Sequence, residues 1–363
     1  MDTIVENAEG HQESSENTKR TTEEELDEFS SHKARIMVIG CGGAGNNTIT
    51  RLHDMGINGA STLAVNTDAN HLKITKADER MLVGKELTKG LGAGGFPEKG
   101  KEAVKENKAE LKRKLDGVDL VFATCGLGGG TGTGGLPEIA RLAKESGSIV
   151  IGTVTMPFKI EGARIAKAEE GLSELRDVCD TVIVIENQRL LDLAGEMPVK
   201  KAFGVADELI STMIKGITET IADPSLVNLD YADVKAVMKA GGVASIGVGE
   251  SDDQHRAEEA ITKALNHPLL EVDYTGATGA LLQIIGGEDM SLDEINKIGE
   301  YVSKRLDSDS QVIWGARVSP QFEGRIQVIS IITGVKSPYI LGPKKQSEGE
   351  ETLDSELGIE VVK

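Results

Sequence analysis

Short apolar runs alternate with helical stretches through the first half of the chain. Apolar runs rich in β-branched residues predict buried strands, and we expect them at residues 35–39, 62–66, 81–83, 120–124, 148–155 and 182–185. Helical periodicity predicts a helix through Leu52 and further helices over residues 98–115, 136–146 and 161–176. This alternation predicts the α/β fold class, with a doubly wound parallel sheet.

The longest helical pattern covers residues 201–222, and Pro224 ends it. Its apolar stripe is wide, which predicts a helix buried between two domains. A further helix is expected through Met238. The second half predicts a smaller α/β domain, with strands at 243–249, 280–285, 312–318 and 326–333 and helices at 254–265 and 292–306.

These patterns divide the chain into five segments. We expect a disordered acidic arm at residues 1–33, a nucleotide-binding domain at 34–200, a central helix at 201–223, a C-terminal domain at 224–335 and a disordered tail at 336–363. The tail ends in the short apolar peptide Leu357–Val362. A partner-docking peptide and an unused tip are both open interpretations of this peptide.

The composition and net charge of the chain exclude several classes of function. Aromatic residues make up only 3% of the chain, so its cores must be aliphatic, and its net charge of -19 argues against nucleic acid and against adsorption to an anionic membrane. No apolar run is long enough to span a bilayer, so no direct membrane insertion is expected. Cys41, Cys125 and Cys179 lack metal-ligand spacing, which is typical of a reducing cytosol, and the six histidines form no evident site.

Three glycine-rich loops follow predicted strands, at residues 40–47, 90–95 and 126–135. Glycine lets the backbone approach a ligand closely, and a helix N-terminus after the loop presents N–H groups to an anion. Gly40, Gly42 and Gly45 match G-x-G-x-x-G, and with Asp68 they leave a nicotinamide-dependent oxidoreductase open. Three loops at one sheet edge favour a nucleoside triphosphate instead.

The motifs together resemble a known family. The run Gly128–Gly134 is similar to the tubulin-superfamily signature, and residues 40–47, Asn66-Thr67-Asp68 and Asn228-x-Asp230-x-x-Asp233 follow in the order found in the FtsZ family. The similarity covers about residues 34–335 and is closest to archaeal members. It implies the tubulin/FtsZ-like fold, with a Rossmann-like GTPase domain, a long central helix and a smaller C-terminal α/β domain. It also implies a GTPase of cell division that binds GTP or GDP, assembles head to tail with itself, and forms a cytoplasmic ring at mid-cell.

The resemblance also implies roles for individual residues. Phosphate and nearby groups would be bound by Gly42, Gly43, Ala44, Gly45, Asn46, Asn47, Ala93, Gly94, Gly95, Gly129, Gly130, Thr131, Gly132, Thr133 and Gly134. Glu161 and Arg164 would hold the ribose and phosphate side. Guanine would donate twice to Asp207 and accept from Asn187, with Phe203 stacked on the base. Without the resemblance, Asp207 is an ordinary polar residue near a helix start.

Asn228, Asp230 and Asp233 follow the central helix. From the residues alone, the two acids are helix-capping groups; the resemblance implies a catalytic loop. Residues 207–222 span roughly 24 Å as a helix, so these acids would reach the nucleotide of a neighbouring subunit and not their own. Mg²⁺ would offset the triphosphate charge, with no metal site built from protein side chains.

Three other functions remain open at this point. A paralogue that determines cell shape would share these motifs, and a GTP-binding scaffold would bind without hydrolysis. The nicotinamide-dependent oxidoreductase is the third. The absence of an anchor predicts an adaptor protein that tethers the C-terminal tail to the membrane.

Overall fold

The computed structural model describes residues 34–222, 226–227, 231–240, 243–266, 274, 276–306 and 310–335. The arm and tail expected at residues 1–33 and 336–363 lie outside this part of the chain, as do Asn228, Asp230 and the side chain of Phe203. All described residues belong to one compact unit that begins at Ala34.

One sheet runs through the described residues, in the strand order β3-β2-β1-β4-β5-β6-β7-β10-β8-β9. Its first six strands pair in parallel, and they are β1 (Ile36–Cys41), β2 (Ala60–Asn66), β3 (Glu79–Leu82), β4 (Leu120–Gly126), β5 (Ile149–Met156) and β6 (Thr181–Glu186). The order 3-2-1-4-5-6 is that of a doubly wound dinucleotide-binding sheet. The predicted α/β fold class is therefore confirmed.

The remaining strands extend this sheet and do not form a separate one. They are β7 (Val243–Ser251), β8 (Gly279–Gly286), β9 (Gln311–Val318) and β10 (Ile326–Thr333). β7 joins β6 through the pairs Val182–Val243 and Ile183–Ala244, while β10 runs antiparallel to both β7 and β8. Hydrophobic alternation predicted the four strands but not this continuity, because alternation does not specify a strand's neighbours.

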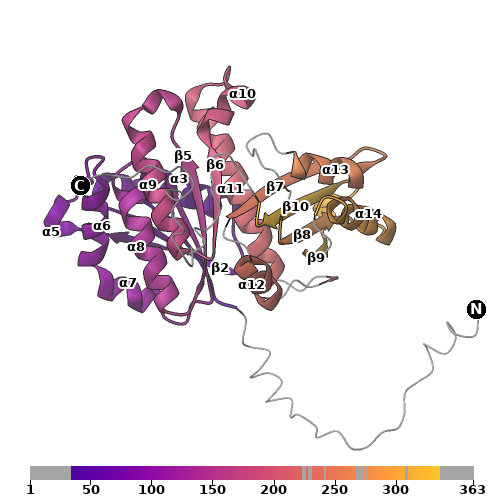
Figure 1. The fold of residues 1–363 in the computed structure, drawn as a ribbon, viewed down its shortest axis with the longest axis horizontal. Helices are drawn as coiled ribbons and strands as arrows, with labels where there is room; N and C mark the ends of the chain where they lie inside the picture. The colour runs from indigo at the N-terminus through magenta and orange to yellow at the C-terminus, as the bar shows by residue number, and fades with distance from the viewer. Residues whose placement is uncertain are drawn as a thin grey trace, which may run out of the picture. The chain divides into compact units, whose positions relative to one another are not determined.

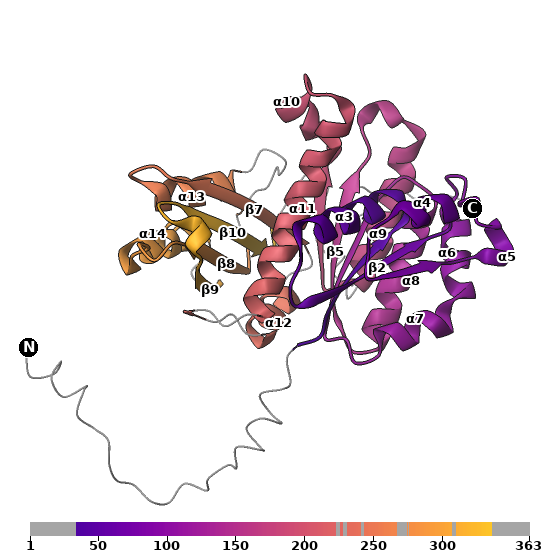
Figure 2. The same ribbon diagram turned by 180° about the vertical axis from the view of Figure 1, so that it is seen from behind.

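Helices cover both faces of the first six strands (Figures 1 and 2). One face carries α6 (Pro97–Glu106), α7 (Lys108–Leu115), α8 (Thr131–Glu145) and α9 (Ala163–Val178). The other carries α3 (Gly42–Met55), α4 (Ala69–Ile74), the central α11 (Val199–Ala222) and α12 (Tyr231–Ala240). The short α5 (Lys85–Thr88) and α10 (Leu190–Ala194) complete this half, and α13 (Arg256–Leu265) and α14 (Leu292–Ser303) cover the other.

The central helix α11 holds the two halves together. Its buried Ile214 and Ile217 belong to a core cluster that also contains Ile183 of β6 and Ile329 of β10. Lys215 Nζ donates to the carbonyl oxygens of Met55 and Gly56 at 2.8 and 2.6 Å. Glu219, almost fully buried, pairs with Arg317 of β9 at 3.1 Å. The helix predicted between two domains therefore contacts both of them.

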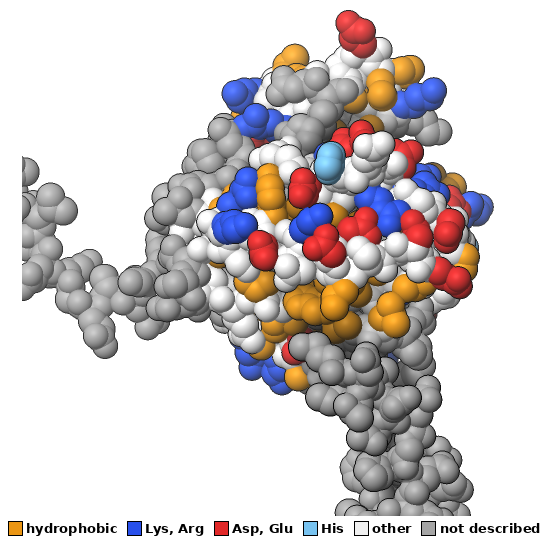
Figure 3. Space-filling model, turned by 90° about the vertical axis from the view of Figure 1, so that its right-hand side faces the viewer, with side chains coloured by type: hydrophobic (Ala, Val, Ile, Leu, Met, Phe, Trp, Pro, Cys, Tyr) orange, Lys and Arg blue, Asp and Glu red, His pale blue; other side chains and the backbone are white. Residues whose placement is uncertain are grey.

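Exposed ion pairs cover α13 and α14, and Figure 3 shows charges of both signs mixed on this face. Lys297 pairs with Asp293 and Lys304 with Glu300, four residues apart along α14. Such pairs contribute a few tenths of a kcal/mol each in water. The buried aliphatic cores, and not these pairs, therefore dominate the stability of the C-terminal half.

Two predicted helices have different boundaries. The helix expected at 136–146 begins at Thr131, inside the glycine loop. The helix expected at 98–115 breaks at Asn107, whose side-chain oxygen accepts from Gly84 N at 3.0 Å. The break therefore coincides with a hydrogen bond to a residue distant in sequence, which a local pattern of charged and apolar residues does not reveal.

Candidate functional site

Two helix N-termini meet at the carboxyl edge of the sheet. α3 begins at Gly42, directly after β1, and α8 begins at Thr131, after β4 and its glycine loop. Neither Cys41 nor Gly130 caps its helix with a side chain. A Cβ on Gly42 would lie 2.9 Å from Gly132 N, so the two backbones touch. Uncapped N–H groups and two helix dipoles thus converge, which suits a polyphosphate.

The third glycine loop packs against the same place. Gly92 N donates to Thr67 O at 3.1 Å. A Cβ on Gly130 would approach the Ala93 side chain to 2.8 Å and Phe96 N to 2.9 Å. Loops distant in sequence are therefore packed without room for side chains, because added carbon atoms would overlap with backbone.

A cavity of about 350 Å³ opens beside these loops, within the size range of about 300–1,000 Å³ typical of ligand pockets. Its lining includes Gly43, Ala44 and Asn47 of α3, Asn187 after β6, and Asp207 of α11. Gly43 and Ala44 are exposed, so the start of α3 is accessible from solvent. The cavity therefore joins backbone that is predicted to bind phosphate to the two residues that are predicted to bind guanine.

Asp207 has the electrostatics of a ligand-binding carboxylate. Burial raises its pKa to about 6, although the Thr48 hydroxyl, which donates to Asp207 Oδ1 at 3.1 Å, and the nearby Arg51 both lower it. The carboxylate is thus partly desolvated and has only one hydrogen-bonded side-chain partner recorded in the described structure. Such a group gains from a ligand that supplies two further donors.

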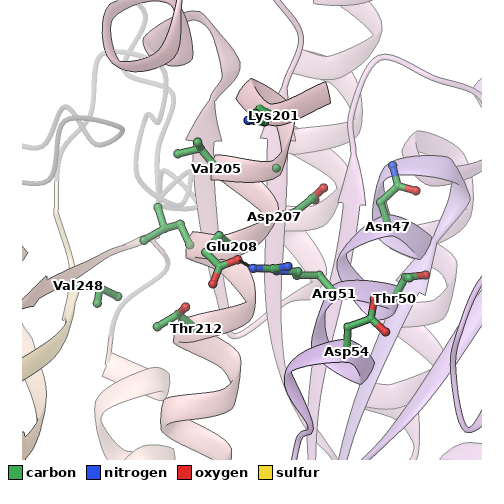
Figure 4. Close-up of a pocket in the computed structure, with 12 residues that line it drawn as sticks. Asn47, Thr50, Arg51, Asp54, Lys201, Val205, Asp207, Glu208, Thr212 and Val248 are labelled. Carbon is green, nitrogen blue, oxygen red and sulfur yellow. Dashed lines mark ion pairs between the residues drawn. The ribbon is translucent and has the colours of Figure 1, made fainter. Parts of the chain in front are cut away.

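Figure 4 shows a larger cavity of about 890 Å³ between α3 and α11. Asn47 and Asp207 line both this cavity and the smaller one, so the two are neighbours. The ion pair of Arg51 and Glu208 crosses it. These two side chains were absent from the predicted site, because their pairing depends on the approach of two helices far apart in sequence.

Other predicted residues occupy different positions around the cavity. Asn46 is fully buried, and with its amide oriented to suit its neighbours it donates to Gly40 O at 2.9 Å and accepts from Asn66 Nδ2 at 2.9 Å. Its side chain therefore stabilises the first glycine loop, at residues 40–47, and does not point into the cavity lining. Thr133 Oγ1 is buried without a hydrogen-bond partner among the described residues, so it retains a donor near the start of α8.

Glu161 and Arg164 lie together at the outer side of the glycine loop. Arg164 Nη1 donates to Glu161 Oε2 at 2.5 Å, and a Cβ on Gly128 would lie 2.9 Å from the Arg164 Cβ. Arg164 remains 60% exposed, so the pair contributes little stability by itself. Their predicted contact with ribose and phosphate stays a prediction.

Besides Arg51 and Glu208, sequence reasoning missed two further polar residues near the glycine loops. Lys167 of α9 donates to Gly95 O at 2.7 Å and so holds the third glycine loop. His71 of α4 lines the smaller cavity. In the sequence, only its position three residues after Asp68 suggests that His71 lies near the glycine loops. Its neighbours in the cavity come from segments elsewhere in the chain.

The cysteines near the glycine loops are packing residues. Cys41 and Cys125 are fully buried. Burial raises the pKa of the Cys41 thiol to about 12, and that of Cys125 also rises well above its ordinary value for the same reason. Their nucleophilic thiolate forms are therefore scarce at neutral pH.

The helix α12, which carries Asp233 of the predicted catalytic set, begins at the opposite edge of the sheet. The Tyr231 hydroxyl, at the start of α12, donates to Asp119 O at 3.0 Å, and Asp119 directly precedes β4. The glycine loop follows the other end of β4, roughly 20 Å away for a strand of this length. Asp233 follows Tyr231 by two residues on α12. It therefore lies near the amino ends of the strands, far from the cavity of the same molecule.

Neither a metal site nor a membrane span is found in the part of the chain that the structure describes. Its His, Cys, Asp and Glu residues form no group of three or more placed to hold a metal ion. None of its helices combines the length and apolar character required to cross a bilayer.

Comparison with known proteins identifies the domains. The GTPase domain of the Tubulin/FtsZ family matches residues 35–195, and the C-terminal domain of the FtsZ family matches residues 242–336. Over 350 residues the chain is 54% identical to cell division protein FtsZ 2 of Methanocaldococcus jannaschii, which covers 93% of this chain and 92% of that protein. The chain belongs to the FtsZ family. The resemblance seen in its motifs is thereby confirmed, and the first domain is a GTPase domain, which decides against the oxidoreductase.

Other members of the family support this assignment. Cell division protein FtsZ 1 of Pyrococcus abyssi is 53% identical over 320 residues, covering 88% of this chain and 86% of that protein. A solved FtsZ dimer from M. jannaschii superposes with a TM-score of 0.81 at 50% identity, covering 87% and 93% of the two chains. CetZ2 of Haloferax volcanii, at 24% identity and a TM-score of 0.71, shares the fold.

Proposed function

We propose that this protein is a GTP-dependent, self-assembling protein of cell division that stacks head to tail and hydrolyses GTP between copies. The observation that carries the proposal is the separation of two sites across the sheet. The glycine loops and Asp207 lie at the carboxyl edge, while Asp233 lies near the amino edge. Stacking one copy on another brings the two edges together, and such a heterologous contact builds an open filament.

The cavity fits a guanine nucleotide in its chemistry. Two uncapped helix N-termini would receive the phosphates, through the backbone of residues 42–45 and 129–134. Asp207 would accept the two adjacent donors of guanine, and Asn187 would donate to its carbonyl. Mg²⁺ held by the phosphate oxygens would offset their charge. GTP and GDP are the proposed ligands.

Hydrolysis then depends on the neighbouring copy. Asp230 and Asp233 would orient and polarise the attacking water at the terminal phosphate of the adjacent molecule, with Asn228 completing the loop. Phosphoryl transfer needs mostly positioning and charge stabilisation from the protein, which two carboxylates beside a water provide. We propose no role for these residues toward the nucleotide of their own subunit.

We infer the cellular role of this protein from its relatives in the FtsZ family. Relatives in several archaea are named cell division proteins, and we propose the same role here, in a cytoplasmic ring at mid-cell. The functional parts would be the segments 34–200, 201–223 and 224–335. The tail beyond residue 335 would reach a membrane-tethering adaptor.

A steady-state assay tests this function. With GTP and Mg²⁺, light scattering should rise and phosphate release per protein molecule should increase steeply above a threshold protein concentration, because the site forms only on assembly. Below the threshold, activity should be near background while GTP still binds. Specific activity that stays constant across the concentration series would contradict hydrolysis between copies.

A further inference from the structure

His71 stands at the junction of two predicted phosphate-binding loops. Its backbone N–H donates to Asp68 Oδ1 at 3.0 Å, and the adjacent Ala69 N donates to Gly90 O at 3.0 Å, which ties this segment to the third glycine loop. On its other side, His71 Nε2 would lie 3.9 Å from a Cβ placed on Gly43. The ring therefore lies on the cavity wall beside the start of α3, and its backbone segment is held against the loop at residues 90–95.

The two ring nitrogens have different surroundings. Nδ1 is buried, and no described residue offers it a hydrogen-bond partner. A proton on Nδ1 would leave a buried donor unpaired, which is costly. We therefore assign the proton of the neutral ring to Nε2, on the side of Gly43, where it can donate. The Nε2–H of His71 beside Gly43 would then find its hydrogen-bond acceptor in an anionic ligand bound at the start of α3.

We propose that His71 is a side-chain ligand of the terminal phosphate of a bound nucleoside triphosphate, and that it distinguishes triphosphate from diphosphate. The inference rests on the proposed function, because it takes the cavity as a GTP site. Asp207 and Asn187 define the base end of the cavity. The His71 ring lies beside Gly43, at the start of α3, so a nucleotide bound by its base at Asp207 would direct its phosphates toward this ring. GDP would leave the donor unused.

Binding of a non-hydrolysable GTP analogue and of GDP tests the proposal, measured by equilibrium titration of the full chain. In His71→Ala, affinity for the GTP analogue should fall about tenfold, the effect of one hydrogen bond to a charged acceptor. Affinity for GDP should change less than about twofold. His71→Gln places an amide donor near the position of Nε2 and should retain most of the preference, whereas His71→Asn should behave like His71→Ala.

His53→Gln is the matched control, because His53 is exposed near the end of α3 and away from the cavity lining. It should leave both affinities unchanged. Equal losses of GTP-analogue and GDP affinity in His71→Ala, or no loss at all, would overturn the proposal. A loss in His71→Gln as large as in His71→Ala would overturn the assignment of Nε2 as donor. Failure of the wild-type chain to bind either nucleotide would refute the proposed function itself.

Discussion

Replacing Asp233 with alanine is expected to lower GTP turnover by about 100-fold or more, the contribution of a positioned catalytic carboxylate. GTP binding should remain, because Asp233 lies on α12, at the opposite edge of the sheet from the cavity. Filaments should still form, because the proposed assembly requires bound GTP and not its hydrolysis. Phosphate release and nucleotide titration on the same samples measure the two quantities separately. A variant that keeps its turnover would show that Asp233 has no catalytic role.

Two further variants separate chemistry from folding. Asp233 lies in the first turn of α12, where a carboxylate also stabilises the helix by up to about 1 kcal/mol. Asp233→Asn keeps the size of the side chain and removes its charge, so it should lose turnover while the protein loses no more than this contribution of about 1 kcal/mol. Asp252→Ala removes an exposed acid from the same half of the protein and should leave turnover unchanged.

Replacing Asp207 with asparagine is expected to change which base the cavity accepts. An amide cannot accept from both guanine donors, so GTP affinity should fall about 100-fold or more, the cost of losing charge-assisted hydrogen bonds. Xanthine carries a carbonyl where guanine carries its amino group, so the amide can donate there, and XTP should bind better than GTP. Glu208→Gln, one residue along α11, should keep the preference for GTP.

The pH dependence of binding follows from the same residue. Burial raises the pKa of Asp207 to about 6, and the proposed contact with the two guanine donors requires the ionised carboxylate. GTP affinity should therefore be independent of this group well above pH 6 and should fall as the pH is lowered through about 6. Titration of the nucleotide phosphates also contributes, so the comparison is with Asp207→Asn, which should lack the Asp207 component. Identical pH profiles would contradict the role of Asp207.

Much of the fold could be predicted because its signals are local. Runs of β-branched residues specified the strands, and the glycine loops marked the carboxyl ends of β1 and β4. The start of α8 at Thr131 could not be predicted, because Thr131–Gly135 has weak helix propensity and is helical in a buried setting. The sheet continues from β6 to β7 because residues 182 and 183 pair with residues 243 and 244, and no local sequence pattern encodes a pairing over that separation.

The candidate site likewise has a part that local sequence signals predicted and a part that only the folded structure shows. Glycine spacing predicted where phosphate-binding backbone would lie, but the importance of Asp207 and Asp233 came from the family resemblance. The structure adds a physical reason to regard Asp207 as a ligand-binding residue, because its carboxylate is buried and its pKa is raised. Neither property can be read from the sequence, because both depend on how the chain folds around this residue. It also adds His71, whose surroundings come from the segments around Gly43 and Gly90. Long-range packing of this kind leaves no periodicity in a sequence.

The central claim is that one molecule completes the active site of another, and mixing the two variants tests it most directly. Asp233→Ala has an intact GTP cavity, and Asp207→Asn has an intact acidic loop. Neither should hydrolyse GTP alone. With GTP and XTP both present and equal amounts of the two variants in the sedimented polymer, about a quarter of randomly formed head-to-tail contacts should join an intact GTP cavity to an intact loop. The account predicts GDP formation well above the sum of the separate samples; GDP formation equal to that sum would contradict it.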